Sequence, residues 1–202
     1  MQDMQGIESV LATSGNTIHV RRASKPEVKI FTLGVDSITA AELRSLIGED
    51  PVDFVVNVPK DSTFDDDVIG LAQELGFGFG GLGDLARALK LDSPASYVPK
   101  QVDFILRGLR QHSAVESVER IAVNLYRLKG RHWPELTMID LDAYELPGEA
   151  VRQALDNHVF DFVLASNAYR GPTSAAIEVA AHAGKKLVIW KELYSNLHKP
   201  WN

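Results

Sequence analysis

A hydroxyl, a carboxylate and an imidazole are placed at helical spacing near the carboxyl end of the chain, after an apolar segment and a short loop. Ser174, Glu178 and His182 are four residues apart, so they share one face of a helix over residues 173–183. A carboxylate beside a loop can act as a nucleophile or as a general acid or base. The segment therefore predicts a ligand site with Glu178 as its acidic residue, and the alternative is a solvated helix face with a capped first turn. The remaining candidate contacts with the ligand are Asn167, Arg170, Gly171 and Thr173, together with Ser174.

The sequence from residue 160 to residue 189 resembles the corresponding region of the nucleoside 2-deoxyribosyltransferases. The shared features are an apolar strand that begins with Asp161, a loop, a helix that carries Glu178, and a Gly184-Lys185 pair before the next strand. In that family the glutamate attacks C1′ of the sugar. The resemblance implies that Glu178 is a nucleophile, with Asp161 in the same catalytic site, and that the ligand is a nucleoside or a nucleotide.

A second constellation lies in the first half of the chain. Asp36 follows one predicted strand, and Asn57 and Lys60 follow the next. Nucleases that use divalent metals place acids and a lysine on neighbouring strands to hold the metal and activate water. This layout is similar to a degenerate restriction-endonuclease-like core. The second half offers Asp140, Asp142 and Glu145 but no matching lysine, so ordinary polar residues at strand ends remain the competing interpretation.

The middle of the chain is basic although the whole protein is acidic. Residues 84–132 contain nine Lys and Arg against five acidic residues, whereas the full chain has a formal charge of −6. Such a segment could follow a nucleic-acid backbone or bind an acidic partner. The alternative is a mixed, solvated surface. A third functional class, a non-catalytic module for protein interaction, stays open, and so does a homo-oligomer.

Composition excludes several other classes of site. The chain has no cysteine, which removes disulfides, cysteine-held zinc and thiol nucleophiles. Its six histidines show no metal-binding spacing, so the sequence predicts neither a metal site nor a cofactor. No apolar run is long enough to span a membrane, and residues 1–10 lack the pattern of a signal peptide. We therefore expect a globular, cytoplasmic protein without a membrane segment.

Short apolar strands alternate with amphipathic helices along most of the chain. Residues 53–58 and 160–166 are nearly continuous apolar runs, which is typical of parallel strands covered on both faces. Thr39 and Glu42 form a capping box that starts a helix. The remaining predicted strands are 17–22, 27–33, 77–79, 119–128, 136–142 and 186–190, and the remaining predicted helices are 65–75, 83–90, 100–112 and 147–157.

An internal repeat organises these elements. The Asp-Phe-Val sequence at residue 53 recurs at residue 161, and Gly76 recurs as Gly184, both at an offset of 108. The sequence therefore predicts an α/β protein with two Rossmann-like ββαβαβ halves, residues 1–80 and 116–202, joined by a helical connector over residues 81–115. Ligands of such folds bind beyond the carboxyl ends of the strands, which places the expected site in the loops that follow them.

Overall fold

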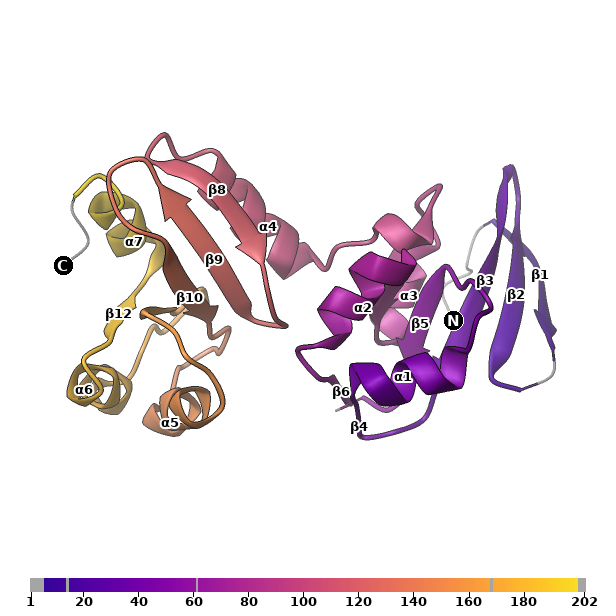
Figure 1. The fold of residues 1–202 in the computed structure, drawn as a ribbon, viewed down its shortest axis with the longest axis horizontal. Coiled ribbons are helices and arrows are strands. Elements are labelled where there is room, and N and C mark those ends of the chain that lie inside the picture. The colour runs from indigo at the N-terminus through magenta and orange to yellow at the C-terminus, as the bar shows by residue number, and fades with distance from the viewer. Residues whose placement is uncertain (1–5, 14, 61, 168, 200–202) are drawn as a thin grey trace. The chain divides into compact units, whose positions relative to one another are not determined.

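The chain forms two compact units, Met1–Lys100 and Gln101–Asn202. The structure, a computed structural model, describes residues 6–13, 15–60, 62–167 and 169–199 (Figure 1). Each unit is a mixed five-stranded sheet with helices on both faces. These two units confirm the α/β prediction with two halves at the level of architecture. Within the described residues, no helix is both long enough and apolar enough to cross a membrane.

The sheet of the first unit has the order β1-β2-β3-β5-β7, in which the first three strands are antiparallel and the last two continue in parallel. Phe31, Leu33 and Val55 pack with α1 and α2 on one face, and α3 covers the other. Its elements are β1 (Ile7–Ala12), β2 (Thr17–Arg22), β3 (Lys25–Leu33), β4 (Ser37–Ile38), α1 (Ala40–Ile47), β5 (Phe54–Asn57), β6 (Thr63–Phe64), α2 (Val68–Leu75), β7 (Gly78–Gly80), α3 (Leu82–Ala88) and the 3₁₀ turn η1 (Pro94–Ser96).

The second unit repeats this arrangement, with the sheet order β12-β11-β10-β9-β8. Helices α5 and α6 lie side by side on one face, and α4 and α7 pack on the other (Figure 1). Its elements are α4 (Lys100–Arg110), β8 (Val115–Arg120), β9 (Leu125–Gly130), β10 (Leu136–Asp140), α5 (Gly148–Asn157), β11 (Phe162–Leu164), α6 (Ser174–His182), β12 (Lys186–Val188) and α7 (Trp190–Asn196).

The two sheets match residue by residue at an offset of 108. Ile30 pairs with Phe54 in the first sheet, and Met138 pairs with Phe162 in the second. The same offset relates all the pairs of strands, including the irregularity that follows the first paired residue of β1 and of β8. The first sheet has two further residue pairs, Arg22 with Lys25 and Leu33 with Asn57. The offset also relates α3 to α7. In each helix the third residue, Asp84 or Glu192, is acidic and accepts the backbone N–H of the residue that precedes the helix. The structural repeat therefore extends from β1 to α3 and from β8 to α7.

Local sequence signals explain where several of these elements begin and end. The predicted capping box is confirmed, because the Glu42 backbone N–H donates to Thr39 Oγ1 and the Thr39 backbone N–H donates to the Glu42 carboxylate. Gly76 ends α2 with a φ of 73°, a left-handed conformation that glycine adopts without strain. The glycine-rich segment after it forms β7, where a Cβ on Gly78 would lie 2.6 Å from the Pro94 carbonyl oxygen. Close packing therefore accounts for that glycine.

The structure differs from the predicted ββαβαβ order in identifiable places. Each half begins with an additional antiparallel strand, β1 or β8, so only part of each sheet is parallel. Residues 119–128 do not form one strand; the guanidinium of Arg120 donates to the Val123 carbonyl and closes a turn between β8 and β9. The expected connector 81–115 is divided, since α3 packs in the first unit and α4 in the second. Residues 190–196, expected to be the end of a strand and a tail, form α7.

Candidate functional site

A pocket of about 530 Å³ opens in the second unit beyond the carboxyl ends of β10 and β11. Described residues that line it come from the start of α4, the loop after β10 and the loop after β11. They are Gln101, Asp142, Ser166, Asn167 and Tyr169. The edge of the sheet is the one that the sequence predicts for a ligand, because parallel strands converge there with their loops. Of the predicted ligand-binding residues, Asn167 lines this pocket.

Asp140, the last residue of β10, lies behind the residues that line the pocket and is 3% exposed. Met138, two residues earlier on the strand, packs with α4 and α7. Because side chains alternate between the two faces of a strand, Asp140 lies on the same face of the sheet as Met138. Gln101 Nε2 donates to Ser166 Oγ at 2.8 Å. Ser166 and Gln101 both lie close enough to the Asp140 carboxylate to lower its pKa. Its Oδ1 atom nevertheless has no hydrogen-bond partner among the described residues.

Burial governs the ionisation of Asp140. It raises the pKa of the carboxyl from 3.8 to about 6, because the charged form loses its hydration. The nearby Asp142 carboxylate raises the pKa further, whereas the hydrogen bonds from Ser166 and Gln101 oppose the shift. A buried, incompletely paired carboxylate lowers the stability of a fold, and such groups are concentrated in functional sites.

The first unit shows that the fold does not require these polar groups. At an offset of 108, the positions of Asp140 and Asp142 are occupied by Thr32 and Gly34, and those of Ser166 and Asn167 by Val58 and Pro59. Thr32 satisfies its hydroxyl locally, by donating to the Asn16 carbonyl at 2.9 Å. Gln101 has no structural counterpart, because α4 precedes the repeated part of the second unit. The polar cluster is thus a specific feature of the second half.

Two exposed tyrosines stand close together beside the pocket. The rings of Tyr144 and Tyr169 lie 5.9 Å apart at an interplanar angle of 26°, and their side chains are 60% and 84% exposed. The Arg170 guanidinium lies 5.8 Å from the centre of the Tyr144 ring. Aromatic rings at the mouth of a polar pocket provide a surface on which a flat ligand can stack. Of the residues named from sequence, Arg170 therefore lies at this rim.

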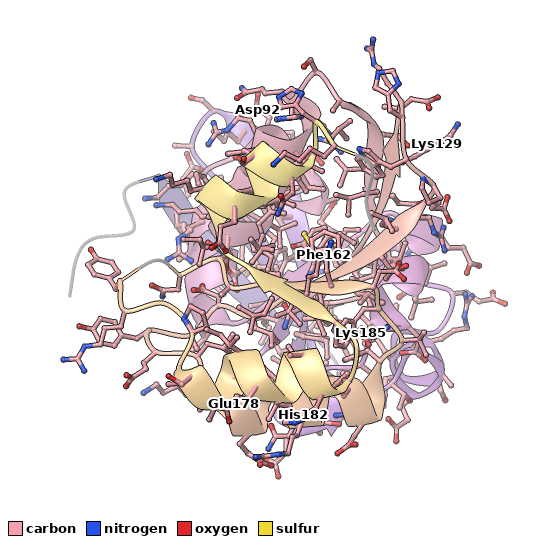
Figure 2. The ribbon with its side chains drawn as sticks, turned by 90° about the vertical axis from the view of Figure 1, so that its left-hand side faces the viewer. Asp92, Lys129, Phe162, Glu178, His182 and Lys185 are labelled. Atoms are coloured by element: carbon pink, nitrogen blue, oxygen red, sulfur yellow. The ribbon has the colours of Figure 1, made fainter. Side chains whose placement is uncertain are left out.

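Glu178 does not line the pocket. It lies on α6 with His182, and both residues are exposed (Figure 2). The remaining predicted contacts serve the loop before α6, where Thr173 Oγ1 accepts the Ala176 N–H and donates to the Leu146 carbonyl. Ser174 is exposed at the start of α6, and Gly171 adopts a φ of 73°. The structure thus gives Thr173 a role in building the loop, which the capping chemistry of the sequence also predicts.

Asp161 lies at the opposite end of β11 from the pocket. Its carboxylate accepts the Thr137 backbone N–H at 2.6 Å, and the equivalent Asp53 accepts the Lys29 backbone N–H at 2.8 Å. Both halves therefore use this aspartate, which directly precedes β5 or β11, to join that strand to its neighbour, β3 or β10. That shared role explains the Asp-Phe-Val repeat in the sequence without any catalytic function.

We expect Asp161→Ala to lower the free energy of unfolding by about 1–3 kcal/mol, because a backbone N–H loses a charged acceptor. Ligand binding at the pocket should be unchanged at a temperature where the variant is folded. Denaturant titration followed by tryptophan fluorescence measures the stability, since all three tryptophans lie in the second half. Asp53→Ala is the matched change in the first half. Loss of ligand binding in folded Asp161→Ala would show that Asp161 has more than this structural role.

The second predicted constellation is separated by the packing of Asn57. This side chain is fully buried, donates from Nδ2 to the Val35 carbonyl at 2.9 Å and accepts the Val35 N–H at 3.3 Å. Its amide is thereby occupied in holding the loop after β3. Asp36 and Lys60 are both exposed on the loops around it. Across the described part of the chain, no group of three or more His, Asp or Glu residues could hold a metal ion.

The basic middle segment is shared between the two units. Many of its cations pair with nearby carboxylates, which leaves a mixed surface within each unit. The pairs are Arg87–Asp84, Arg107–Asp103, Arg127–Glu119, Arg127–Glu135 and Lys129–Glu116.

The convergence of Gln101, Asp140 and Ser166 is the part of the site that sequence analysis misses. An aspartate and a serine at the ends of two consecutive apolar strands are the only local signal, and Gln101 gives none. Comparison of the chain with family models, with curated proteins and with solved structures finds no match. The case for function therefore depends on the geometry of this site.

Proposed function

We propose that the second half of the protein binds a small nucleoside-like ligand in the pocket beyond β10 and β11. The observation that carries the proposal is the buried Asp140 carboxylate, whose Oδ1 atom has no partner among the described residues. Because this atom has almost no accessible surface, a ligand would act on the carboxylate through Ser166 and Gln101, which line the pocket. The first half, which has the same fold, has Thr32 at this position and no such group.

The charge of the pocket indicates which ligands it accepts. Asp142 contributes negative charge at the lining and Asp140 contributes it from behind the lining, whereas the other described lining residues, Gln101, Ser166, Asn167 and Tyr169, are neutral. Two carboxylates repel an anionic group and favour a neutral or cationic ligand with several hydrogen-bond donors. The hydroxyls of a sugar satisfy that requirement. A free phosphate does not.

The aromatic rim of the pocket would supply a second set of contacts with the ligand. A nucleobase that stacks on Tyr169 would leave its sugar to reach the polar groups of the pocket. Base–aromatic stacking contributes roughly 1–3 kcal/mol for each base. An aromatic ring for stacking, together with a carboxylate whose hydrogen bonds are incomplete, favours a nucleoside over a purely polar metabolite. The proposal assigns no catalytic role to Glu178, whose side chain is exposed on α6.

A thermal-shift panel of the four ribonucleosides tests the proposal, with a chelator present. A nucleoside at about 100 times its dissociation constant adds roughly 2.7 kcal/mol to the free energy of unfolding, which corresponds to an increase on the order of 5–10 °C in Tm. We expect this increase in the wild type and in Glu178→Gln. Asp140→Asn should reduce it by well over half, and Tyr169→Ala should weaken binding about tenfold or more.

Glu178→Gln is the matched control, because it removes one acidic charge from the same half of the protein. Absence of a shift with every nucleoside would contradict the proposal. So would a nucleoside shift that Asp140→Asn and Tyr169→Ala leave intact. Isothermal titration of the nucleoside with the largest shift then gives the affinity directly.

A further inference from the structure

Helix α4 covers a part of the second sheet whose equivalent in the first sheet has no helix over it. In the second unit α4 packs on the same face of the sheet as α7, over β8, β9 and β10 (Figure 1). Its apolar residues there are Val102, Ile105, Leu106 and Leu109. On the equivalent face of the first unit, α3 takes the place of α7. Within the described residues of the first unit, no helix takes the place of α4.

Apolar side chains on this uncovered part of the first sheet are exposed, whereas their counterparts beneath α4 are buried. Val10 on β1 is 53% exposed, and the equivalent Val118 on β8 is 8% exposed. Ile18 on β2 is partly exposed, and the equivalent Tyr126 on β9 is buried. Val10 pairs with Val20 of the core, so its side chain lies on the core face of the sheet. The two sheets therefore differ here in what covers them.

Two further apolar residues of the first unit are exposed where α4 makes contacts in the second. Leu82 begins α3 and is 55% exposed, whereas its counterpart Trp190 packs with α4. Val58 follows β5 and is exposed, whereas its counterpart Ser166 is buried and accepts a hydrogen bond from Gln101 of α4. We define the open face by these exposed positions, which are Val10, Ile18, Val58 and Leu82.

The residues beneath the place of α4 specify what kind of helix the open face accepts. A Cβ on Gly108 of α4 would lie 2.6 Å from the Tyr194 hydroxyl oxygen, so only glycine fits there. The counterpart of Tyr194 is Ala86, which leaves room for a larger side chain. Val58 offers no hydrogen bond to a side chain such as Gln101. A helix on the open face should therefore be apolar at both positions where α4 carries Gln101 and Gly108.

We propose that the open face binds an amphipathic helix of a partner protein, in the place that α4 occupies in the second unit. Its apolar residues should follow the i, i+3, i+4 and i+7 spacing of α4, with apolar side chains added at the two positions named above. The repeat selects this occupant, because the same strands in the second unit hold a helix at the same place. The proposal is independent of the nucleoside pocket, which lies in the second unit.

A fluorescently labelled peptide tests the proposal on the full chain. The peptide has the sequence of residues 99–112 with Gln101→Leu and Gly108→Leu, and fluorescence anisotropy measures its binding. Gly108→Leu also keeps the peptide from replacing α4, because Tyr194 leaves no space for the leucine. We expect one peptide per chain, bound about tenfold more tightly or better than the unmodified peptide. Far-UV circular dichroism should show a gain of helix on binding, because so short a helix is marginal in water.

Two pairs of equally exposed residues supply matched variants. Val10→Glu places a charge on the open face, and Leu11→Glu places it on the opposite face of β1, at a residue that is 50% exposed. Leu82→Glu is matched by Leu46→Glu, because Leu46 is 51% exposed on α1, which packs on the other face of the sheet. We expect Val10→Glu and Leu82→Glu to weaken peptide binding about tenfold or more. The two control variants should bind as the wild type does, and circular dichroism checks that all four are folded.

Three results would overturn the partner helix. The first is the absence of binding by the modified peptide at millimolar concentration. The second is binding that the four variants reduce equally or leave intact. The third is a dimer in sedimentation velocity that Val10→Glu and Leu82→Glu dissociate and Leu11→Glu does not, since that result would assign the open face to a second copy of this chain.

Discussion

Asp140→Asn should stabilise the second half of the protein by on the order of 3 kcal/mol at pH 7.5, in the absence of divalent cations. The reason is the raised pKa of Asp140, about 6 in the folded protein against 3.8 when exposed. Each unit of pKa shift corresponds to about 1.4 kcal/mol. Asparagine has nearly the same shape and no charge to desolvate. A substitution that removes a functional carboxylate and stabilises the fold is the expected signature of a site selected for binding.

The pH dependence of this effect has a definite sign. Between pH 3.8 and about 6 the folded protein binds the Asp140 proton and the unfolded chain releases it. The free energy of unfolding that this group contributes is therefore greatest below pH 3.8, falls as the pH rises to about 6, and is constant above that. We expect the advantage of Asp140→Asn to be largest above pH 7 and to vanish near pH 4.

Urea titrations of the two proteins at pH 4, 5, 6 and 7.5, followed by tryptophan fluorescence, measure this difference. Taking the difference between variant and wild type cancels the other titrating groups, including Glu27 and Glu42, whose pKa values are lowered by hydrogen bonds. Glu178→Gln is the second control, since it removes an exposed carboxylate from the same half of the protein. An Asp140→Asn variant that is less stable than the wild type at pH 7.5 would show that the carboxylate is well paired after all.

Arg22→Met should lower the stability of the first half by about 3–5 kcal/mol. Arg22 is 5% exposed, and its guanidinium donates to the carbonyls of Pro26, Leu89, Leu91 and Asp92. These bonds fix the segment that follows α3 against the end of β2. Methionine fills much of the same space but leaves the four carbonyl oxygens without this donor, and an unsatisfied buried group costs roughly 1–3 kcal/mol.

The neighbouring Arg21 is the matched control for this prediction. Its side chain is 62% exposed and pairs with Glu27 on the surface, so Arg21→Met should change the stability by less than about 1 kcal/mol. Circular dichroism during thermal unfolding gives the overall effect. Amide hydrogen exchange over residues 17–33 assigns it to the first half, which contains no tryptophan. Equal effects of the two substitutions would contradict the role given to Arg22.

The position of Arg22 also illustrates how the halves diverged within one architecture. The equivalent residue in the second half is Gly130, and the ring of Trp133 packs against it so closely that a Cβ would lie 2.0 Å from the indole. One half therefore uses a hydrogen-bonded arginine at this corner, and the other uses an aromatic ring over a glycine. The offset of 108 residues is preserved although the interactions differ.

The sequence by itself determined most of the elements and the repeat. Apolar runs at 53–58 and 160–166, the capping box at Thr39 and the glycine that ends α2 each depend on residues that are near neighbours in the chain. The strand β1 is missed because its sequence, IESVLA, contains apolar residues but does not alternate regularly between apolar and polar ones. The split of residues 119–128 is missed because the Arg120 side chain closes the turn.

Only the tertiary structure decided which polar residues form a site. Glu178 has a favourable spacing in the sequence but lies exposed on α6, and Asn57 is used to hold a loop. Gln101, Asp140 and Ser166 come from a helix and the ends of two strands, and they meet because α4 packs over the sheet of the second half. Burial is what leaves the Asp140 oxygen without a partner, and burial is a property of packing between distant segments that local residue patterns do not encode.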